Sequence, residues 1–154
     1  MKVKDMALIS IVAALYIAIT FVLAPISFGM FQFRISEMLN VLMKYKRKYI
    51  YAMIIGVALA NFNSPIGLID VAFGVACAIV MGAVYQVVKN TTVATIINGI
   101  AVGILIGIML HVFYGAPLIL SMISVGVTQC ITLGIGQVIF KELAKHESLK
   151  SLFE

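Results

Sequence analysis

Residues 91–140 read TTVATIINGIAVGILIGIMLHVFYGAPLILSMISVGVTQCITLGIGQVIF and contain no Asp, Glu, Lys or Arg. An α-helix rises 1.5 Å per residue, so about 20 apolar residues span the roughly 30 Å hydrocarbon core of a bilayer. The segment is therefore long enough for two crossings. Its strongest turn signal is Tyr114-Gly-Ala-Pro117, because Gly and Pro interrupt helices. We predict two transmembrane helices that meet at this turn.

The rest of the chain has the same apolar character. Of its 154 residues, 63% are hydrophobic and only 11% are charged, whereas a soluble domain needs more polar surface. Further apolar runs cover Met6–Leu23, Tyr49–Ala60 and Val71–Val88, and a helical segment follows the loop 25–33. We expect Met6–Leu23 to be a retained first helix and not a signal peptide. The sequence predicts one all-α integral membrane domain, residues 1–154, as a compact bundle of about six transmembrane helices.

The basic residues fall at alternate ends of the six predicted helices, which places them on one face of the membrane. Ten of the eleven follow this pattern: Lys2, Lys4, Lys44, Lys46, Arg47, Lys48, Lys89, Lys141, Lys145 and Lys150. The positive-inside rule makes that face cytoplasmic, with both termini on it. The net charge of +5 therefore indicates membrane anchoring and not nucleic-acid binding, which needs a basic face or stripe. Arg34 alone lies on the opposite side.

Two predicted crossings are short. As a helix, Tyr49–Ala60 covers only about 18 Å, and the segment around Arg34–Met43 is no longer. Irregular backbone at membrane depth is tolerated only where it faces protein or a water-filled cavity. We expect an opening in the outer half of the bundle, lined by the ends of these helices.

The exceptional Arg34 begins a polar stripe with Glu37 and Asn40 at three-residue spacing. A charge inside the membrane costs about 2.5–3.5 kcal/mol even on the lenient insertion scale, so such residues are functional candidates. Asp70 follows a second predicted turn on the outer side, residues 61–67 (NFNSPIG), and is a further candidate. The alternatives are a local ion pair at a helix entrance and, for Asp70, an ordinary helix N-cap.

Other polar residues are weaker candidates for a ligand site. They are Asn61, which could cap a helix end, Gln129, which is costly to bury, and Tyr114, which could anchor the interface. The hydroxyl stripe Ser121, Ser124, Thr128 and Thr132 is expected to bond back to its own helix. The double GxxxG of Gly99, Gly103 and Gly107 is expected to serve helix packing.

Several kinds of chemistry lack a motif in this sequence. There is no GxxxxGK[ST] for a P-loop, no CxxC, and no His/Cys spacing suited to zinc. Cys77 and Cys130 lie in apolar runs, where cysteine behaves as a small hydrophobic residue. A catalytic Cys/His set and a serine with an evident base are also missing. We therefore expect no cofactor, no metal and no enzymatic activity.

Two segments are similar to a known family. They are APISFGMFQFRISEMLN, residues 24–40, and NFNSPIGLIDVAFG, residues 61–74. Both resemble the QueT family of substrate-binding subunits of energy-coupling-factor (ECF) transporters, and the similarity runs through most of the chain. The resemblance implies a small subunit that binds a queuosine precursor, a deazaguanine, at the outer face. It also implies docking onto a transmembrane coupling protein that carries two cytoplasmic ATPase subunits.

The resemblance assigns roles to two further segments. In such subunits an AxxxA pair on the first helix contacts the coupling protein, and Ala14-Leu-Tyr-Ile-Ala18 matches it. The loop after the first helix acts as a lid, which corresponds to Pro25–Phe33.

A deazaguanine suits the polar candidates, because a carboxylate accepts paired N–H groups from its guanine-like edge. Glu37 and Asp70 supply two acids, and Asn40, Asn61 or Gln129 could bind carbonyl and ring nitrogens. The residues that could stack on the flat ring are Phe31, Phe33, Phe62 and Phe73. Two other readings stay open: a different heterocyclic vitamin as the solute, or an accessory membrane protein in which Arg34 and Glu37 only stabilise the bundle.

Overall fold

The computed structural model describes residues 3–27, 33–147 and 149–153, and every regular element in these ranges is helical. In chain order they are α1 (Val3–Val22), α2 (Ala24–Ser27), the 3₁₀ helix η1 (Ile35–Val41), α3 (Leu42–Tyr45), α4 (Tyr49–Asn61), α5 (Leu68–Val87), α6 (Thr91–Tyr114), α7 (Leu118–Leu143) and α8 (Lys150–Phe153). Among the described helices, α1, α5, α6 and α7 are long and apolar enough to cross a bilayer. The all-α prediction is confirmed, and α4, with 13 residues, is as short as expected.

The second predicted crossing has an unusual conformation. Seven residues form the 3₁₀ helix η1, which continues into the single α-helical turn of α3. A 3₁₀ helix has three residues per turn and seldom exceeds four residues. Side chains three apart are therefore aligned, and this places Glu37 and Asn40 on one face. Arg34 precedes the helix in extended backbone, with φ −102° and ψ 103°.

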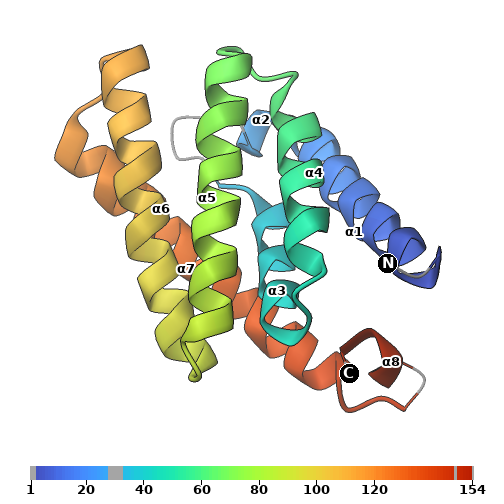
Figure 1. Cartoon of the computed structure of the whole chain (residues 1–154). Helices are drawn as coiled ribbons and strands as arrows, with labels where there is room; N and C mark the ends of the chain where they lie inside the picture. Colours follow the sequence, from blue (N-terminus) through green and yellow to red (C-terminus); the bar gives the residue numbers. More distant parts are fainter. Residues whose placement is uncertain (1–2, 28–32, 148, 154) are drawn as a thin grey trace.

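One end of the bundle collects the basic loops, as Figure 1 shows at its lower edge. Lys48 Nζ lies 2.7 Å from Asp5 Oδ1, and Lys44 Nζ donates to the carbonyl of Val88 at 2.7 Å. These contacts join the start of α1 to the α3–α4 loop, and α3 to the end of α5. The other end carries α2 and the α4–α5 and α6–α7 connections (Figure 1). The chain thus has one basic end; that this end is cytoplasmic stays a prediction.

The α6–α7 hairpin is packed through glycine. A Cβ at Gly103 would lie 2.7 Å from the Met122 carbonyl, and one at Gly107 would lie 2.5 Å from Met122 Cγ. A Cβ at Gly99 would collide with the side chain of Cys130. The glycines therefore let the two backbones approach closely, which confirms the packing role predicted for the double GxxxG.

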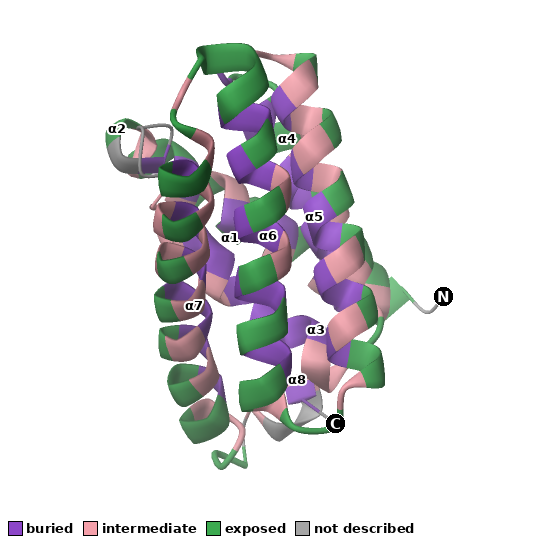
Figure 2. Cartoon of the chain, turned by 90° about the vertical axis from the view of Figure 1, so that its left-hand side faces the viewer, coloured by how far each residue is buried: buried purple, intermediate pink, exposed green. Residues whose placement is uncertain are grey.

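The η1 helix occupies the centre of the bundle, where it packs against α1, α4, α5 and α7. Gly136 on α7 makes room for it, since a Cβ there would lie 2.5 Å from the Met38 carbonyl. On its other side is the face of α1 that carries Ala13, Tyr16 and Thr20, all buried. The outward faces of α6 and α7 are exposed (Figure 2), and they carry large apolar side chains such as Ile100, Ile104 and Ile123, which suit contact with lipid.

Candidate functional site

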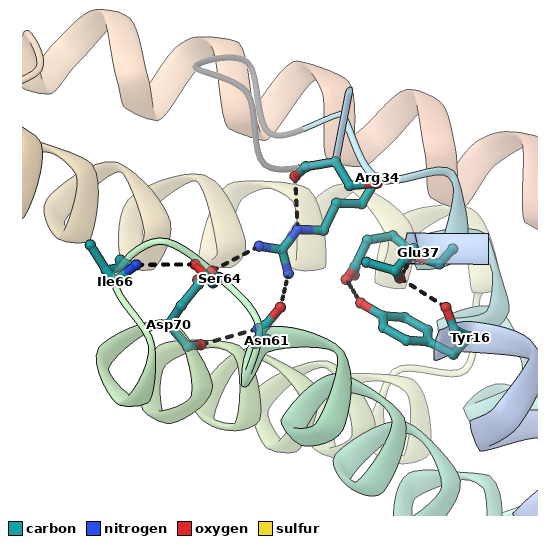
Figure 3. Close-up of polar contacts among 10 residues, drawn as sticks. Tyr16, Arg34, Glu37, Asn61, Ser64, Ile66 and Asp70 are labelled. Atoms are coloured by element: carbon teal, nitrogen blue, oxygen red, sulfur yellow. Dashed lines mark hydrogen bonds and ion pairs between the residues drawn. The ribbon is translucent and has the colours of Figure 1, made fainter. Parts of the chain in front are cut away.

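Arg34 reaches into the bundle and binds residues from two other helices. Its Nη1 donates to Asn61 Oδ1 at 2.6 Å, and its Nη2 lies 3.2 Å from Asp70 Oδ2. The Nε donates to the carbonyl of Ser27 at 3.2 Å. Arg34 is 8% exposed and Asp70 only 2%, so this is a buried ion pair (Figure 3). Asn61 also donates to the backbone carbonyl of Asp70 at 3.1 Å, which orients its oxygen toward Arg34.

Glu37 is the centre of a second, adjoining network. Its carboxylate accepts from the hydroxyl of Tyr16 on α1 (Figure 3). It also accepts from Asn40 Nδ2 at 2.7 Å and from Gln129 Nε2 on α7 at 2.9 Å. Three donors can stabilise an ionised carboxylate away from water. The network ties η1 to the helices on both sides of it.

Several buried acceptors are unused. Among the described residues, Asp70 Oδ1 and Asn40 Oδ1 have no hydrogen-bond partner, although Asn40 is fully buried and Asp70 nearly so. Buried polar atoms are normally paired, and an unpaired one costs free energy. Both atoms are acceptors, so the group that would satisfy them is one that presents N–H or O–H donors.

A small cavity adjoins these networks. It is lined by Arg34, Glu37 and Gln129 together with apolar residues of α4 to α7, among them Cys77 and Met81. The space open to the centre of a water molecule is about 30 Å³, which accommodates one or two waters. A bicyclic heterocycle needs more room, so its binding would require side chains to move. The structure thus has a small cavity beside the short helices η1 and α4, while the opening expected in the outer half stays a prediction.

The polar groups of the site favour a particular kind of ligand. One guanidinium and two carboxylates give a net charge of +1 − 2 = −1 when all three are ionised. Together with the unpaired acceptors, this favours a ligand that is rich in donors or carries a positive charge. Among the described residues, no group of three or more His, Cys, Asp or Glu could hold a metal ion.

The structure brings together six of the residues singled out in the sequence and leaves one apart. Those in the two networks are Arg34, Glu37, Asn40, Asn61, Asp70 and Gln129. Tyr114 is half exposed at the end of α6 and joins neither network in the described part of the chain. Of the four candidate stacking residues, Phe62 is exposed, Phe73 packs edge-on against Phe113, and Phe33 is partly buried. The fourth, Phe31, lies outside the described residues.

Two further expectations have different outcomes. The N-cap reading of Asp70 is wrong, because α5 begins earlier with Gly67 as its N-cap, and Asp70 instead pairs with Arg34. The hydroxyls of Ser124, Thr128 and Thr132 do donate to carbonyls of their own helix, at 2.8–3.2 Å. Of the proposed lid, Pro25–Ser27 lies in α2, while residues 28–32 are outside the described ranges.

Tyr16 was missed by the sequence analysis. It is fully buried on α1 and its hydroxyl donates to Glu37. One helical turn later, Thr20 shares a hydrogen bond of 2.7 Å with Ser36 of η1. A buried tyrosine hydroxyl usually needs a partner, but the burial of Tyr16 is visible only in the structure. The pair Ala14 and Ala18 lies on the opposite, exposed face of the same helix.

Comparisons with known proteins give a consistent result. A family model described as QueT transporter matches residues 6–145. The curated Queuosine precursor transporter QueT of Lactococcus lactis subsp. cremoris (strain MG1363) is 48% identical over 65 residues. That stretch is 41% of this chain and 38% of the relative, so the match spans well under half of the relative's length. No solved structure matches the chain.

Proposed function

This chain belongs to the QueT transporter family, and on that premise we propose that it captures a queuosine precursor as the substrate-binding subunit of an ECF transporter. It is a multi-pass membrane protein of the plasma membrane. The solute would be a deazaguanine, taken up from the outer side.

The observation that carries the proposal is the buried polar site at the centre of an apolar bundle. Two carboxylates and a guanidinium are costly inside a membrane and are retained there mainly where they serve a solute. Asp70 Oδ1 and Asn40 Oδ1, unpaired within the described residues, offer acceptors to a ligand. A deazaguanine has a ring N–H next to an amino group, which together match a carboxylate in a paired way. An aminomethyl substituent would bring a cation that suits the second acid.

The orientation follows from the charges. If the basic end faces the cytoplasm, as the positive-inside rule requires, Arg34 and Asp70 lie in the outer half. The solute would then enter from outside, near α2 and the α4–α5 connection. Binding would need expansion of the small cavity, since it has room for only one or two waters.

Binding is tested by isothermal titration of the whole chain in nanodiscs with 7-aminomethyl-7-deazaguanine. We expect saturable binding that Glu37→Gln and Asp70→Asn each weaken by roughly 10- to 150-fold, the value of one hydrogen bond to a charged group. Glu142→Gln, which neutralises an exposed acid at the end of α7, should bind like the wild type.

The outcomes separate the open readings. Unchanged binding in both site variants would show that the solute sits elsewhere. Saturable binding of another heterocyclic vitamin in its place would change the solute class. No saturable ligand at all would favour an accessory membrane protein.

The proposed partners are the coupling protein and its two ATPases, and their docking is tested separately. Ala14 and Ala18 are exposed on α1, which leaves them available to another helix. Replacing both by Leu should abolish uptake into proteoliposomes with the partner subunits while leaving solute affinity unchanged. Ala83→Leu, at an exposed position of α5, is the matched control. Loss of affinity in the α1 variant would contradict a docking role.

A further inference from the structure

The guanidinium of Arg34 has the same donor pattern as the edge of a deazaguanine. In both, a carbon joins nitrogens whose N–H groups point in parallel, and this fork fits a carboxylate with two hydrogen bonds. In the structure the fork is held by Asn61 Oδ1 at 2.6 Å and Asp70 Oδ2 at 3.2 Å. Asn61 is the last residue of the short helix α4, and Asp70 lies in the first turn of α5.

The contact between Arg34 and Asp70 uses only part of what the carboxylate can accept. Only Oδ2 of Asp70 meets the guanidinium, while Oδ1 has no hydrogen-bond partner among the described residues. A buried ion pair is well compensated only when its geometry is good and its remaining lone pairs are satisfied. Asp70 therefore keeps acceptor capacity that Arg34 does not fill.

Arg34 also restricts the space that a solute needs. Its side chain lines the small cavity together with Glu37 and Gln129. Its backbone is extended and lies before η1, so the side chain is attached outside any helix. Asn61 and Asp70, by contrast, are fixed on α4 and α5.

We propose that Arg34 occupies, in the empty protein, one of the two Asp70 oxygens that the guanine-like edge of the solute takes on binding, namely Oδ2. This inference rests on the proposed function. Solute binding then exchanges the Arg34–Asp70 ion pair for a two-point contact between the solute and Asp70. Arg34 is a specificity-determining residue in this scheme, because only a donor fork can replace it.

The exchange makes a prediction that distinguishes it from a direct contact. The apparent Kd is the intrinsic Kd divided by the fraction of molecules whose site is free. If Arg34 is seated in about nine tenths of the empty molecules, its removal strengthens binding roughly tenfold. A direct contact between Arg34 and the solute predicts weaker binding in the same variant.

The experiment titrates 7-deazaguanine and 7-deazahypoxanthine, which lacks the amino group, into the chain in nanodiscs. Arg34→Ala should bind 7-deazaguanine roughly tenfold more tightly than the wild type. It should keep the preference over 7-deazahypoxanthine, whereas the double variant Arg34→Ala with Asp70→Asn should lose that preference. Arg47→Ala, an exposed arginine at the basic end, should leave both affinities unchanged.

Chemical rescue gives a second readout. Methylguanidinium added to Arg34→Ala should fill the vacated acceptors and weaken 7-deazaguanine binding competitively, with no such effect on the wild type. Where the alanine variant does not fold, Arg34→Gln replaces it, since glutamine keeps hydrogen-bonding groups without the charge.

The results separate this inference from the function on which it rests. If the wild type binds the solute and removal of Arg34 weakens that binding or leaves it unchanged, the exchange is overturned and the proposed function stands. Absence of binding in the wild type and in every Arg34 variant overturns the proposed function itself.

Discussion

Gly136 is the position at which η1 touches α7, and its replacement by Ala should disturb both stability and binding. A Cβ at this position would lie 2.5 Å from the Met38 carbonyl and 2.9 Å from Met38 Cβ. Ordinary contacts begin at 3.4 Å, so η1 and α7 would have to separate by nearly 1 Å. Gln129 and Glu37, now 2.9 Å apart, belong to the same two helices and would lose their hydrogen bond.

The expected magnitude follows from three contributions. Overpacking costs about 1–3 kcal/mol, and a lost hydrogen bond to a charged group costs about 1.5–3 kcal/mol. Alanine regains up to about 1 kcal/mol over glycine within a helix. The net loss is therefore roughly 1.5–5 kcal/mol, which on the scaling of domains of this size lowers Tm by roughly 3–20 °C.

The assay uses the cysteines, because the chain contains no tryptophan. Cys77 is 4% exposed, so a thiol-reactive dye that fluoresces on labelling reports unfolding in detergent. Cys130→Ala removes the second, partly exposed thiol. Gly134→Ala is the matched control, since a Cβ there meets nothing within 4 Å. If the two alanine variants melted at the same temperature, the close approach of η1 and α7 would be refuted.

Three further predictions concern single contacts. Tyr16→Phe removes the hydroxyl that donates to Glu37. We therefore expect the free energy of unfolding to fall by about 1.5–3 kcal/mol, and titration to show weaker solute binding. Asn90→Ala removes the N-cap of α6, whose side chain accepts from Thr92 N at 2.9 Å. Thermal unfolding should show a free energy of unfolding lower by about 1 kcal/mol, and Asn90→Ser should restore it. Gly115→Ala should lower the free energy of unfolding by about 1–2 kcal/mol, because Gly115 has a left-handed φ of 66°. Asn tolerates this conformation better than Ala, so equal stability of Gly115→Ala and Gly115→Asn would contradict this reason.

The helices that cross the membrane were predictable because their signal is local. An uncharged run of 50 residues with one turn motif suffices to define α6 and α7, and Gly and Pro mark the turn between them. The basic clusters likewise predicted which loops share one end. Such features depend on the solvent that each segment meets and not on which segments meet one another.

The conformation of η1 could not be predicted in the same way. Composition does not distinguish a 3₁₀ helix from an α-helix, and the choice here is made by packing against α1, α4, α5 and α7. The three-residue spacing of Glu37 and Asn40 was visible but fits either helix. The start of α5 was also misplaced, since Gly67 and not Asp70 is its N-cap.

The candidate residues were largely found, but their partners were not. Buried charge made Arg34, Glu37 and Asp70 conspicuous, because each is costly in a bilayer. Their pairing depends on contacts between residues 36 and 92 positions apart, for which one sequence gives no local signal. Tyr16 was missed for the same reason, since its partner Glu37 lies 21 positions later.

The distant partners of η1 have a consequence for how the protein is made. Arg34 and Glu37 are synthesised before Asp70 and long before Gln129, the residues that neutralise or bind them. Until α5 and α7 have entered the bilayer, each unpaired charge would cost about 2.5–3.5 kcal/mol at its centre. The η1 segment is made after Tyr16, which already donates to Glu37, but before Asp70 and Gln129. Its polar contacts are therefore completed only once α5 and α7 have been made.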